Sequence, residues 1–421
     1  MGKYITFNLD AFPLTDNLYD VNDYNAILVY SAISDPLFKY DGNNITKNAT
    51  KEYKVSFTGK KHVFIIRDDL KNAQGCCINA THYKDVLETI IANTNNKIRY
   101  LLDNVKKITA TGNKLTIFLY KKDFQFYKIL SGVNFSPVCG LYTIKTKTKN
   151  TILLTPNKYH RDYTPNTKNL KFQLVPKSTD DILLFKNDKA NFTSNTNLSH
   201  KQINRNKCFL HIYPNFITCS LTFLNPLFFA KSNKNLRCFI RDSIKKSAIA
   251  GKIDNIIIPT DNYFIADVNC DFLRSPFKKF DSKNKKFTLG YDDFYPNYII
   301  AYCIKEQLEQ NGMSVELVKD DYFNPKLNYD MKITLSYPDY VDDISFYKSK
   351  YVETLVKITR TKCYRKYCKR LFDKNIKPET LQKLNYIIQK EALVIPLFKM
   401  NSIYLSKNNT FDFRLLNYEQ L

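Results

Sequence analysis

Short segments of two kinds alternate along the chain. Residues 52–59 and 61–69, EYKVSFTG and KHVFIIRDD, alternate apolar and polar positions around a turn with glycine, which is typical of a β-hairpin. Residues 114–121, 150–159 and 169–176 also have strand character, and residues 25–42 form an apolar element that ends in a turn at Asp41-Gly42. Apolar residues at helical spacing predict a helix over 83–108, and residues 180–194 indicate a helix followed by a strand.

The second half of the chain continues the alternation. Residues 235–252 are expected to form a helix that ends at Gly251, and residues 298–321 a helix closed by Asn311-Gly312 and followed by a strand. Because helices and strands alternate in blocks over the whole length, the pattern predicts an α/β fold with an α+β insertion early in the chain. A chain of 421 residues is long enough for two or three lobes.

The charge of the chain raises a nucleic-acid alternative. The formal net charge is +24, but lysine is spread over the whole length and accompanies many Asn, Ile, Tyr and Phe residues, as A/T-rich codons favour. Proteins that bind nucleic acid usually cluster their basic residues. We therefore expect no nucleic-acid partner, and a basic polyanion-binding protein remains the alternative from another functional class.

No motif of an enzyme or a metal site is visible in the sequence. The chain contains no GxSxG, HExxH or P-loop motif, and its five histidines are scattered. Its ten cysteines include no CxxC pair, although CYRKYC at 363–368 would allow a bridge or a metal ligand pair. We expect that the protein is not an enzyme and that it has no catalytic residues, no metal and no cofactor. Most of the cysteines lie among apolar residues, as free core thiols do, and this favours a reducing compartment for the protein.

An ordered series of short motifs resembles one family. AILVYSAISDPLFKYDG, KEYKVSFTGKKHVFIIRDDLKNAQG, THYKDVLETI, CGLYTIKTKTKNTILLTPNKYH, SLTFLNP, NLRCFIRDSIKKSAI, IKEQLEQNGMSVELV and ALVIPLFKMNSIYL follow one another in the order of the peptide-binding branch of the ABC-transporter solute-binding proteins, family five. Each motif is short, and the resemblance lies in their order over almost the whole chain. The chain departs from the family at Lys245, where an acidic residue is usual, and in having no Trp for the ligand pocket.

The resemblance implies a two-lobed periplasmic-binding-protein type II fold with an extra α+β subdomain in the first lobe. It divides the chain into lobe I at 1–40, the inserted subdomain at 41–137, lobe I again at 138–225, lobe II at 226–390, and a C-terminal return to lobe I at 391–421. Gly140 and Tyr142 are expected to be structural, because glycine permits a tight turn and the tyrosine packs.

The acidic stretch SYPDYVDDISF at 336–346 is the central candidate site. In the family, the matching segment reaches the cleft between the lobes, and its first Asp pairs with the α-ammonium of the peptide. The resemblance therefore implies that Asp339 anchors the ammonium group, with Tyr340 beside it. A buried cation requires a fixed carboxylate partner with full hydrogen bonding. Asp342 and Asp343 are expected to be surface or helix-capping acids.

Two further residues are candidate ligand contacts. Asp35, in SDPLF, falls where the first lobe of the family faces the cleft; the alternative is a turn residue at the end of a helix. Asn225, in FLNP, falls where the chain crosses between lobes and would hydrogen-bond the ligand backbone or cap the crossing.

The function implied by the resemblance is that of a solute-binding receptor of an ABC importer. It would bind a peptide, or a related small solute with an amine, and would dock as a monomer on a membrane permease. The expected location is the periplasm or the outer face of the cytoplasmic membrane. The N-terminus lacks the apolar core of a signal peptide. A cytoplasmic sensor, or a degenerate relative on the same fold, is therefore the alternative.

Overall fold

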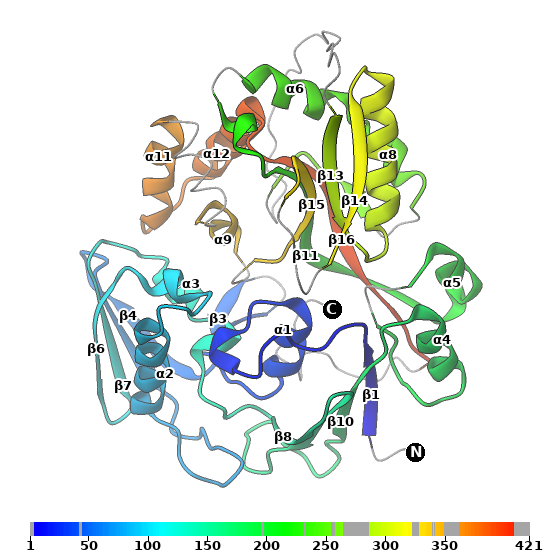
Figure 1. Ribbon diagram of the computed structural model, residues 1–421. Coiled ribbons are helices and arrows are strands. Elements are labelled where there is room, and N and C mark those ends of the chain that lie inside the picture. Colours follow the sequence, from blue (N-terminus) through cyan, green and yellow to red (C-terminus); the bar gives the residue numbers. More distant parts are fainter. Residues whose placement is uncertain are drawn as a thin grey trace.

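The fold has two lobes, which are seen one above the other in Figure 1. A computed structural model describes the following residues: 4–41, 44–194, 198–230, 233–253, 257–263, 286–321, 328–338, 340, 342–348 and 362–407.

The first lobe is built on a mixed four-stranded sheet. Its strands follow the order β1-β10-β9-β8, with β1 parallel to β10 and the other pairs antiparallel. Helix α1 packs with this sheet in one hydrophobic cluster, in which Phe7 stacks on Phe172 at 5.2 Å and on Phe192 at 4.7 Å between ring centroids. The elements are β1 (Tyr4–Leu9), η1 (Leu18–Asp20), α1 (Tyr24–Ser31), β8 (Tyr142–Lys147), β9 (Thr151–Pro156), β10 (Asn169–Leu174) and α4 (Ser178–Lys186).

The inserted subdomain has its own sheet and its own core. Its four antiparallel strands follow the order β4-β5-β7-β6, and helix α2 covers the face that carries Phe64, Leu115 and Ile117. The elements are β2 (Phe38–Tyr40), β3 (Ile45–Lys47), β4 (Thr50–Val55), β5 (Lys61–Ile66), α2 (Ala80–Ala92), η2 (Arg99–Leu102), β6 (Val105–Thr111), β7 (Lys114–Leu119), α3 (Phe126–Ile129) and η3 (Val133–Phe135).

The second lobe is built on a six-stranded sheet of order β12-β16-β11-β15-β13-β14. β13 is parallel to both β14 and β15, and β11 is antiparallel to β15 and β16. The elements are α5 (His200–Arg205), η4 (Lys207–Phe209), β11 (Leu210–Phe223), η5 (Pro226–Phe229), α6 (Lys234–Ser243), α7 (Lys246–Ala250), β12 (Ile257–Pro259), β13 (Lys286–Asp292), α8 (Asn297–Gln310), β14 (Ser314–Asp320), β15 (Met331–Ser336), α9 (Asp343–Lys348), α11 (Lys362–Cys368), η7 (Lys369–Phe372), α12 (Pro378–Glu391) and β16 (Ile395–Leu405).

Two long strands, β11 and β16, connect the lobes. They pair from Leu210 opposite Leu405 to Leu221 opposite Ile395, within the sheet of the second lobe. The end of β16 nevertheless reaches the first lobe. Tyr404 belongs to the core of that lobe, the Leu405 N–H donates to Thr193 Oγ1 at 2.9 Å, and the Thr193 N–H donates to the Leu405 carbonyl at 3.2 Å. The six-stranded sheet thus includes residues on both sides of the expected 225/226 and 390/391 boundaries, and the boundaries themselves stay predictions.

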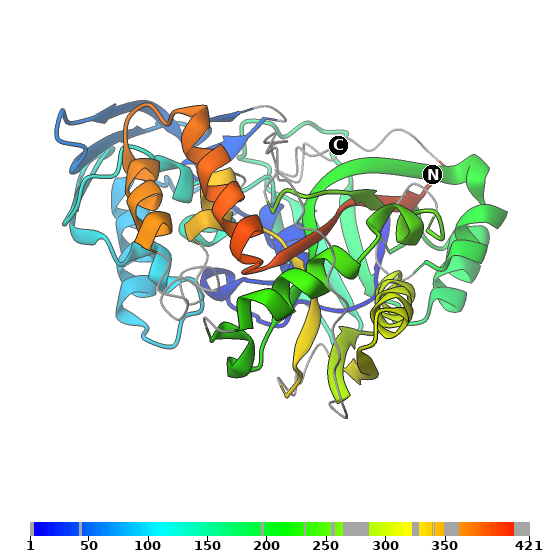
Figure 2. The same cartoon turned by 90° about the horizontal axis from the view of Figure 1, so that it is seen from above.

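The inserted subdomain also contacts the second lobe directly. The Phe124 N–H donates to the Phe372 carbonyl at 3.1 Å, and Lys122 pairs with Asp373 at 2.6 Å. The Gln125 side chain donates to the Asp373 carbonyl at 3.1 Å. Figure 2 shows α11 and α12 beside the subdomain in the view from above. The chain therefore joins the two lobes both at β11 and β16 and along this edge.

Most of the predicted elements are confirmed. The hairpin is formed by β4 and β5, with Gly59 at φ +65° in the turn. The helix and strand expected over 298–321 are α8 and β14, and Gly312 follows the helix at φ +91°. The expected helix over 83–108 is wrong beyond Ala92. The helix ends there because Asn93 takes an extended conformation and Asn93–Asn96 form a turn. Residues 105–108, at the end of the predicted helix, belong to strand β6 instead.

The expected helix over 235–252 is interrupted. It divides into α6 and α7 at Ile244, whose backbone is extended (φ −89°, ψ 111°) and whose side chain is fully buried in the core of the second lobe. Burial of this β-branched side chain therefore outweighs the local helical pattern. The second helix ends before Gly251, as expected.

Gly140 allows two backbone segments to approach closely. A Cβ at this position would lie 2.6 Å from Ile33 C and Ser34 N, and the Gly140 N–H donates to the Ile33 carbonyl at 3.0 Å. Its φ is not positive, so close packing, rather than the expected tight turn, requires glycine here. Tyr142 is buried, as expected.

We predict that Gly140→Ala lowers the free energy of unfolding by about 1–3 kcal/mol, because backbone atoms cannot move aside for the methyl group. Urea unfolding followed by circular dichroism measures the change. Gly251→Ala is the matched control: Gly251 has φ −62°, and its Cβ would approach Ser247 O no closer than 3.6 Å. Equal stability of Gly140→Ala and the wild type would contradict the packing argument.

Candidate functional site

The segment after β15 leaves the second lobe and enters the inserted subdomain. The Tyr337 ring meets the Tyr24 ring of α1 edge-on at 5.9 Å. Pro338 is buried, and Tyr340, 3% exposed, belongs to the hydrophobic core of the subdomain. The segment therefore contacts both parts of the first lobe within four residues. Asp339, the predicted ammonium anchor, lies outside the described residues.

Asp342 fixes the end of this segment. Its Oδ2 accepts a hydrogen bond from Lys128 Nζ at 2.5 Å, and both side chains are only 18% exposed. Its Oδ1 accepts from the Ile344 N–H at 2.9 Å, at the start of α9. The expected capping role of Asp342 is confirmed, and the same carboxylate also joins the second lobe to the subdomain. Asp343 is the first residue of α9.

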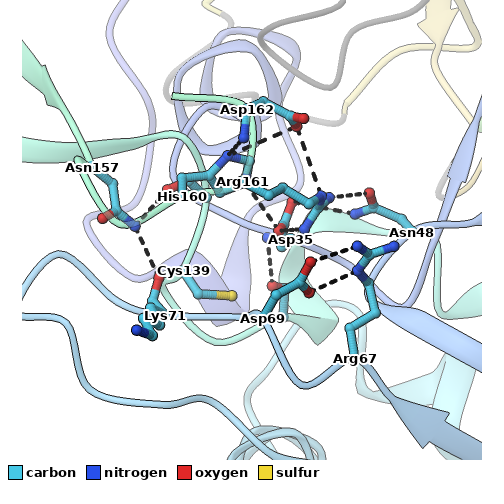
Figure 3. A network of polar contacts seen from close by, with 12 residues as sticks. Asp35, Asn48, Arg67, Asp69, Lys71, Cys139, Asn157, His160, Arg161 and Asp162 are labelled. Carbon is cyan, nitrogen blue, oxygen red and sulfur yellow. Dashed lines mark hydrogen bonds and ion pairs between the residues drawn. The ribbon is translucent and has the colours of Figure 1, made fainter. Parts of the chain in front are cut away.

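Asp35 lies at the centre of a buried polar network (Figure 3). Its carboxylate accepts hydrogen bonds from Arg161 at 2.6 Å, from His160 Nε2 at 3.1 Å and from the Asn48 amide at 3.3 Å. His160 Nδ1 accepts from the Asp162 N–H, so the proton that faces Asp35 is on Nε2. Burial alone would raise the pKa of Asp35, but the His160 hydrogen bond and the Arg161 charge outweigh it and lower the pKa.

This network joins the first lobe to the inserted subdomain. The Tyr83 hydroxyl of α2 donates to the Asp35 carbonyl at 2.6 Å, and the Asp35 N–H donates to Ser136 Oγ at 2.8 Å. Arg161 also donates to the side-chain oxygen Oδ1 of Asn48 at 2.7 Å. Both carboxylate oxygens of Asp35 are thus engaged by the protein. Its predicted contact with ligand is untested and stays a prediction.

The rim of the network is more exposed. Arg67 and Asp69 pair at 2.6 Å with side chains 39% and 47% exposed. Asn157 donates to the carbonyls of Lys71 and Gly140, at 2.9 and 3.2 Å, and so holds the turn after β9 against the subdomain (Figure 3). Cys139 lies beside the network, where burial raises the pKa of its thiol.

Asn225 caps a short helix at the crossing. Its Oδ1 accepts from the Leu227 N–H at 3.0 Å at the start of η5, and its Nδ2 donates to Asp330 Oδ1 at 2.6 Å. Asp330 Oδ2 in turn accepts from the Thr288 N–H at 2.9 Å. The observed contacts therefore correspond to the capping alternative, and a ligand contact by Asn225 stays a prediction.

A second buried ionic group was not expected from the sequence. Lys332 of β15 pairs with Asp292 at 2.9 Å and with Asp320 at 2.6 Å, and the three side chains are 13%, 12% and 0% exposed. Asp292 and Asp320 are register partners at the carboxyl ends of the parallel strands β13 and β14. Burial raises the pKa of Asp292, and the hydrogen bond from Lys332 opposes this shift. No local motif could have identified it, because strand register joins three distant segments.

The described residues contain no group of three or more His, Cys, Asp or Glu side chains placed to hold a metal ion. The cysteines of the described ranges are free thiols, including Cys363 and Cys368 of the CYRKYC stretch. Among the described helices, none combines the length and apolar character needed to cross a membrane.

Comparison with solved structures identifies the fold. The Escherichia coli murein tripeptide binding protein MppA superposes with a TM-score of 0.80 at 16% identity, over 99% of this chain and 96% of that one. DppA from Helicobacter pylori, an ABC transporter-associated periplasmic binding protein in complex with the peptide STSA, gives 0.82 at 13% identity over 99% and 97%. NikA from Brucella suis, in complex with Fe(III)-EDTA, gives 0.79 at 15% identity over 97% and 97%.

The expected two-lobed periplasmic-binding-protein fold is therefore confirmed. No family model and no curated protein matches the chain. Identities of 13% to 16% establish a shared fold and no more. The neighbours include both a peptide complex and an Fe(III)-EDTA complex, so the fold alone does not determine the ligand.

We predict that Asp35→Asn lowers the free energy of unfolding by about 3–5 kcal/mol, because it removes the buried partner of the Arg161 charge and leaves only the exposed Asp162, 3.8 Å away. Asp69→Asn, at the exposed rim, should change it by at most about 1 kcal/mol. Urea unfolding measures both.

The pH dependence tests the same network. Because the folded pKa of Asp35 is lowered, its contribution is present above its unfolded pKa and is lost as pH falls through the folded value. The difference in stability between wild type and Asp35→Asn should therefore shrink in acid. If this difference stays constant down to acid pH, the ionised network is not the source of the stability that Asp35 contributes.

Proposed function

We propose that this chain is the solute-binding receptor of an ABC importer and that it binds a peptide, or a small solute with an amine, between its lobes. The observation that carries the proposal is the path of the segment after β15. Tyr337 contacts α1, Tyr340 lies in the subdomain core, and Asp342 pairs with Lys128. The acidic stretch thus runs from one lobe into the other, where a ligand enclosed by two lobes has to be held.

Within this proposal, Asp339 receives the α-ammonium of the ligand, and Tyr340 positions it. The neighbours of Asp339 in the chain support this role, because Pro338 and Tyr340 are both buried. A buried ammonium group requires a carboxylate held in place rather than one on a freely moving side chain. A segment anchored on both sides supplies that constraint, and peptide backbone groups can then pair with strand-like segments.

Asp35 and Asn225 have structural roles in this proposal. Asp35 holds the inserted subdomain at the angle that the closed form requires, and any contact with ligand is made from that network. Asn225 holds the crossing after β11 in the same way. The chain works as a monomer without a cofactor, in the periplasm or on the outer face of the cytoplasmic membrane, and passes its ligand to a membrane permease. It performs no catalysis.

We predict that Asp339→Asn folds normally but loses its ligand. Removing one partner of a buried charge pair typically costs about 3–5 kcal/mol, which lowers affinity by at least about a hundredfold. Protein purified without refolding is examined by native mass spectrometry, and the wild type should carry additional masses that fragment as peptides, whereas Asp339→Asn should not.

Asp343→Asn is the matched control, because it makes the same substitution four residues later in the same acidic stretch. It should keep the bound peptides. Equal peptide content in Asp339→Asn and the wild type would remove Asp339 from the site. If neither protein carries or takes up peptides from a mixed pool, the receptor proposal itself is contradicted.

A further inference from the structure

An aromatic and basic edge stands out on the inserted subdomain. It consists of Lys54, Phe57, Lys60, Lys61, Tyr120 and Lys121, at the ends of β4, β5 and β7. Phe57 is 100% exposed and Tyr120 is 59% exposed. Exposed large apolar residues rimmed by charged ones can mark an interaction site. We propose that this edge docks on a membrane surface rich in anionic phospholipid.

The turn that carries Phe57 is well ordered. The Gly59 N–H donates to the Ser56 carbonyl at 2.9 Å, and the Ser56 N–H donates to the Lys61 carbonyl at 2.8 Å. A Cβ on Gly59 would meet the Phe124 ring at 2.8 Å, so the back of the turn packs against the subdomain. Phe57 is therefore held outward by a fixed backbone, and its exposure does not result from a loose loop.

Tyr120 and Lys121 are held beside this turn. The Leu119 N–H donates to the Lys60 carbonyl and the Asp123 N–H to the Gly59 carbonyl, at 2.8 and 2.9 Å. Asn104 bonds both the backbone N–H and the carbonyl of Lys121, at 2.9 and 3.0 Å. The two aromatic side chains thus belong to one rigid edge.

The charge of the edge is strongly positive. Among the described residues, Lys60, Lys61 and Lys121 form no ion pair, and Lys61 lies 5.7 Å from the centre of the Phe118 ring. Acidic side chains near the edge are already engaged. Glu52 lies 3.9 Å from Lys54, Asp103 lies 3.8 Å from Arg99, and Asp373 pairs with Lys122. Asp123 is buried, and its Oδ1 accepts from the Gln125 N–H at 2.9 Å. An anionic partner would therefore meet unpaired ammonium groups around an apolar tip.

An anionic membrane fits these features better than nucleic acid does. Single-stranded nucleic acid is held by several aromatic rings on which successive bases stack. On the outer face of this sheet the only aromatic side chain among the paired strands is Phe118, which is partly buried beneath Lys61. An exposed aromatic side chain that inserts at the headgroup level, surrounded by lysines that meet anionic lipids, is typical of membrane-surface binding.

The absence of Trp from the sequence allows a direct test. In Phe57→Trp the indole is a unique fluorophore at the tip. Mixing this full-length variant with vesicles of equal parts phosphatidylcholine and phosphatidylglycerol should shift its emission to the blue, whereas pure phosphatidylcholine should not. Tyr298→Trp, at a 52% exposed position on α8 of the second lobe, should show no shift. An unchanged spectrum of Phe57→Trp would overturn the proposal.

Vesicle co-sedimentation separates the edge from the overall charge of +24. Phe57→Ala should weaken binding about tenfold, and Lys60→Glu with Lys61→Glu should weaken it by about fivefold or more per lysine. Lys145→Glu with Lys149→Glu on the first lobe makes the same change in net charge at exposed positions and should bind like the wild type.

Three outcomes would overturn the proposal. Equal loss in the two lysine pairs would mean that only the net charge attracts the vesicles. Full binding by Phe57→Ala would mean that the tip does not insert. If single-stranded DNA binds through Phe57 and the vesicles do not, the partner is a nucleic acid. Circular dichroism confirms that each variant is folded, and no step of the test depends on peptide binding.

Discussion

The segment that joins β15 to α9 limits how the two lobes can be arranged. It begins as a strand of the six-stranded sheet and, within a few residues, contributes Tyr340 to the core of the inserted subdomain. Asp342 then forms the partly buried pair with Lys128. Moving the lobes apart would expose the Tyr340 side chain and separate two charges that are shielded from water. The position of the acidic stretch is thus coupled to the arrangement of the two lobes.

The Asp35 network has a complementary role within the first lobe. The Asp35 carboxylate joins the segment after α1 to Asn48, between β3 and β4, and to the turn after β9. A buried ionic network specifies geometry through directed hydrogen bonds, whereas apolar packing tolerates small shifts. The subdomain that receives Tyr340 is therefore itself fixed to the first lobe, and the two arrangements together determine where the acidic stretch lies.

The sequence predicted correctly those helices and strands whose ends are marked by a nearby turn or stop residue. The hairpin at β4 and β5 and the helix α8 each carry their own turn or end signal, at Gly59 and Gly312. The helix expected over 83–108 ends at a local turn at Asn93–Asn96, whereas Ile244 interrupts a helix because the core buries it. The partners of Asp35 come from up to 126 residues away, beyond the reach of any local pattern. For the site, sequence and family resemblance selected the acidic stretch, but neither could identify Arg161 or Lys332, which no motif marks.

The most direct test of the account changes the ligand rather than the protein. Ligand-free protein is dialysed against a mixed tripeptide library with free N-termini and, separately, against the same library after N-acetylation, and the retained peptides are quantified by mass spectrometry. If a buried carboxylate holds the α-ammonium, acetylation removes the charge and retention should fall at least about a hundredfold. Equal retention of the two libraries would contradict the account, because the ligand would then be held without its ammonium group.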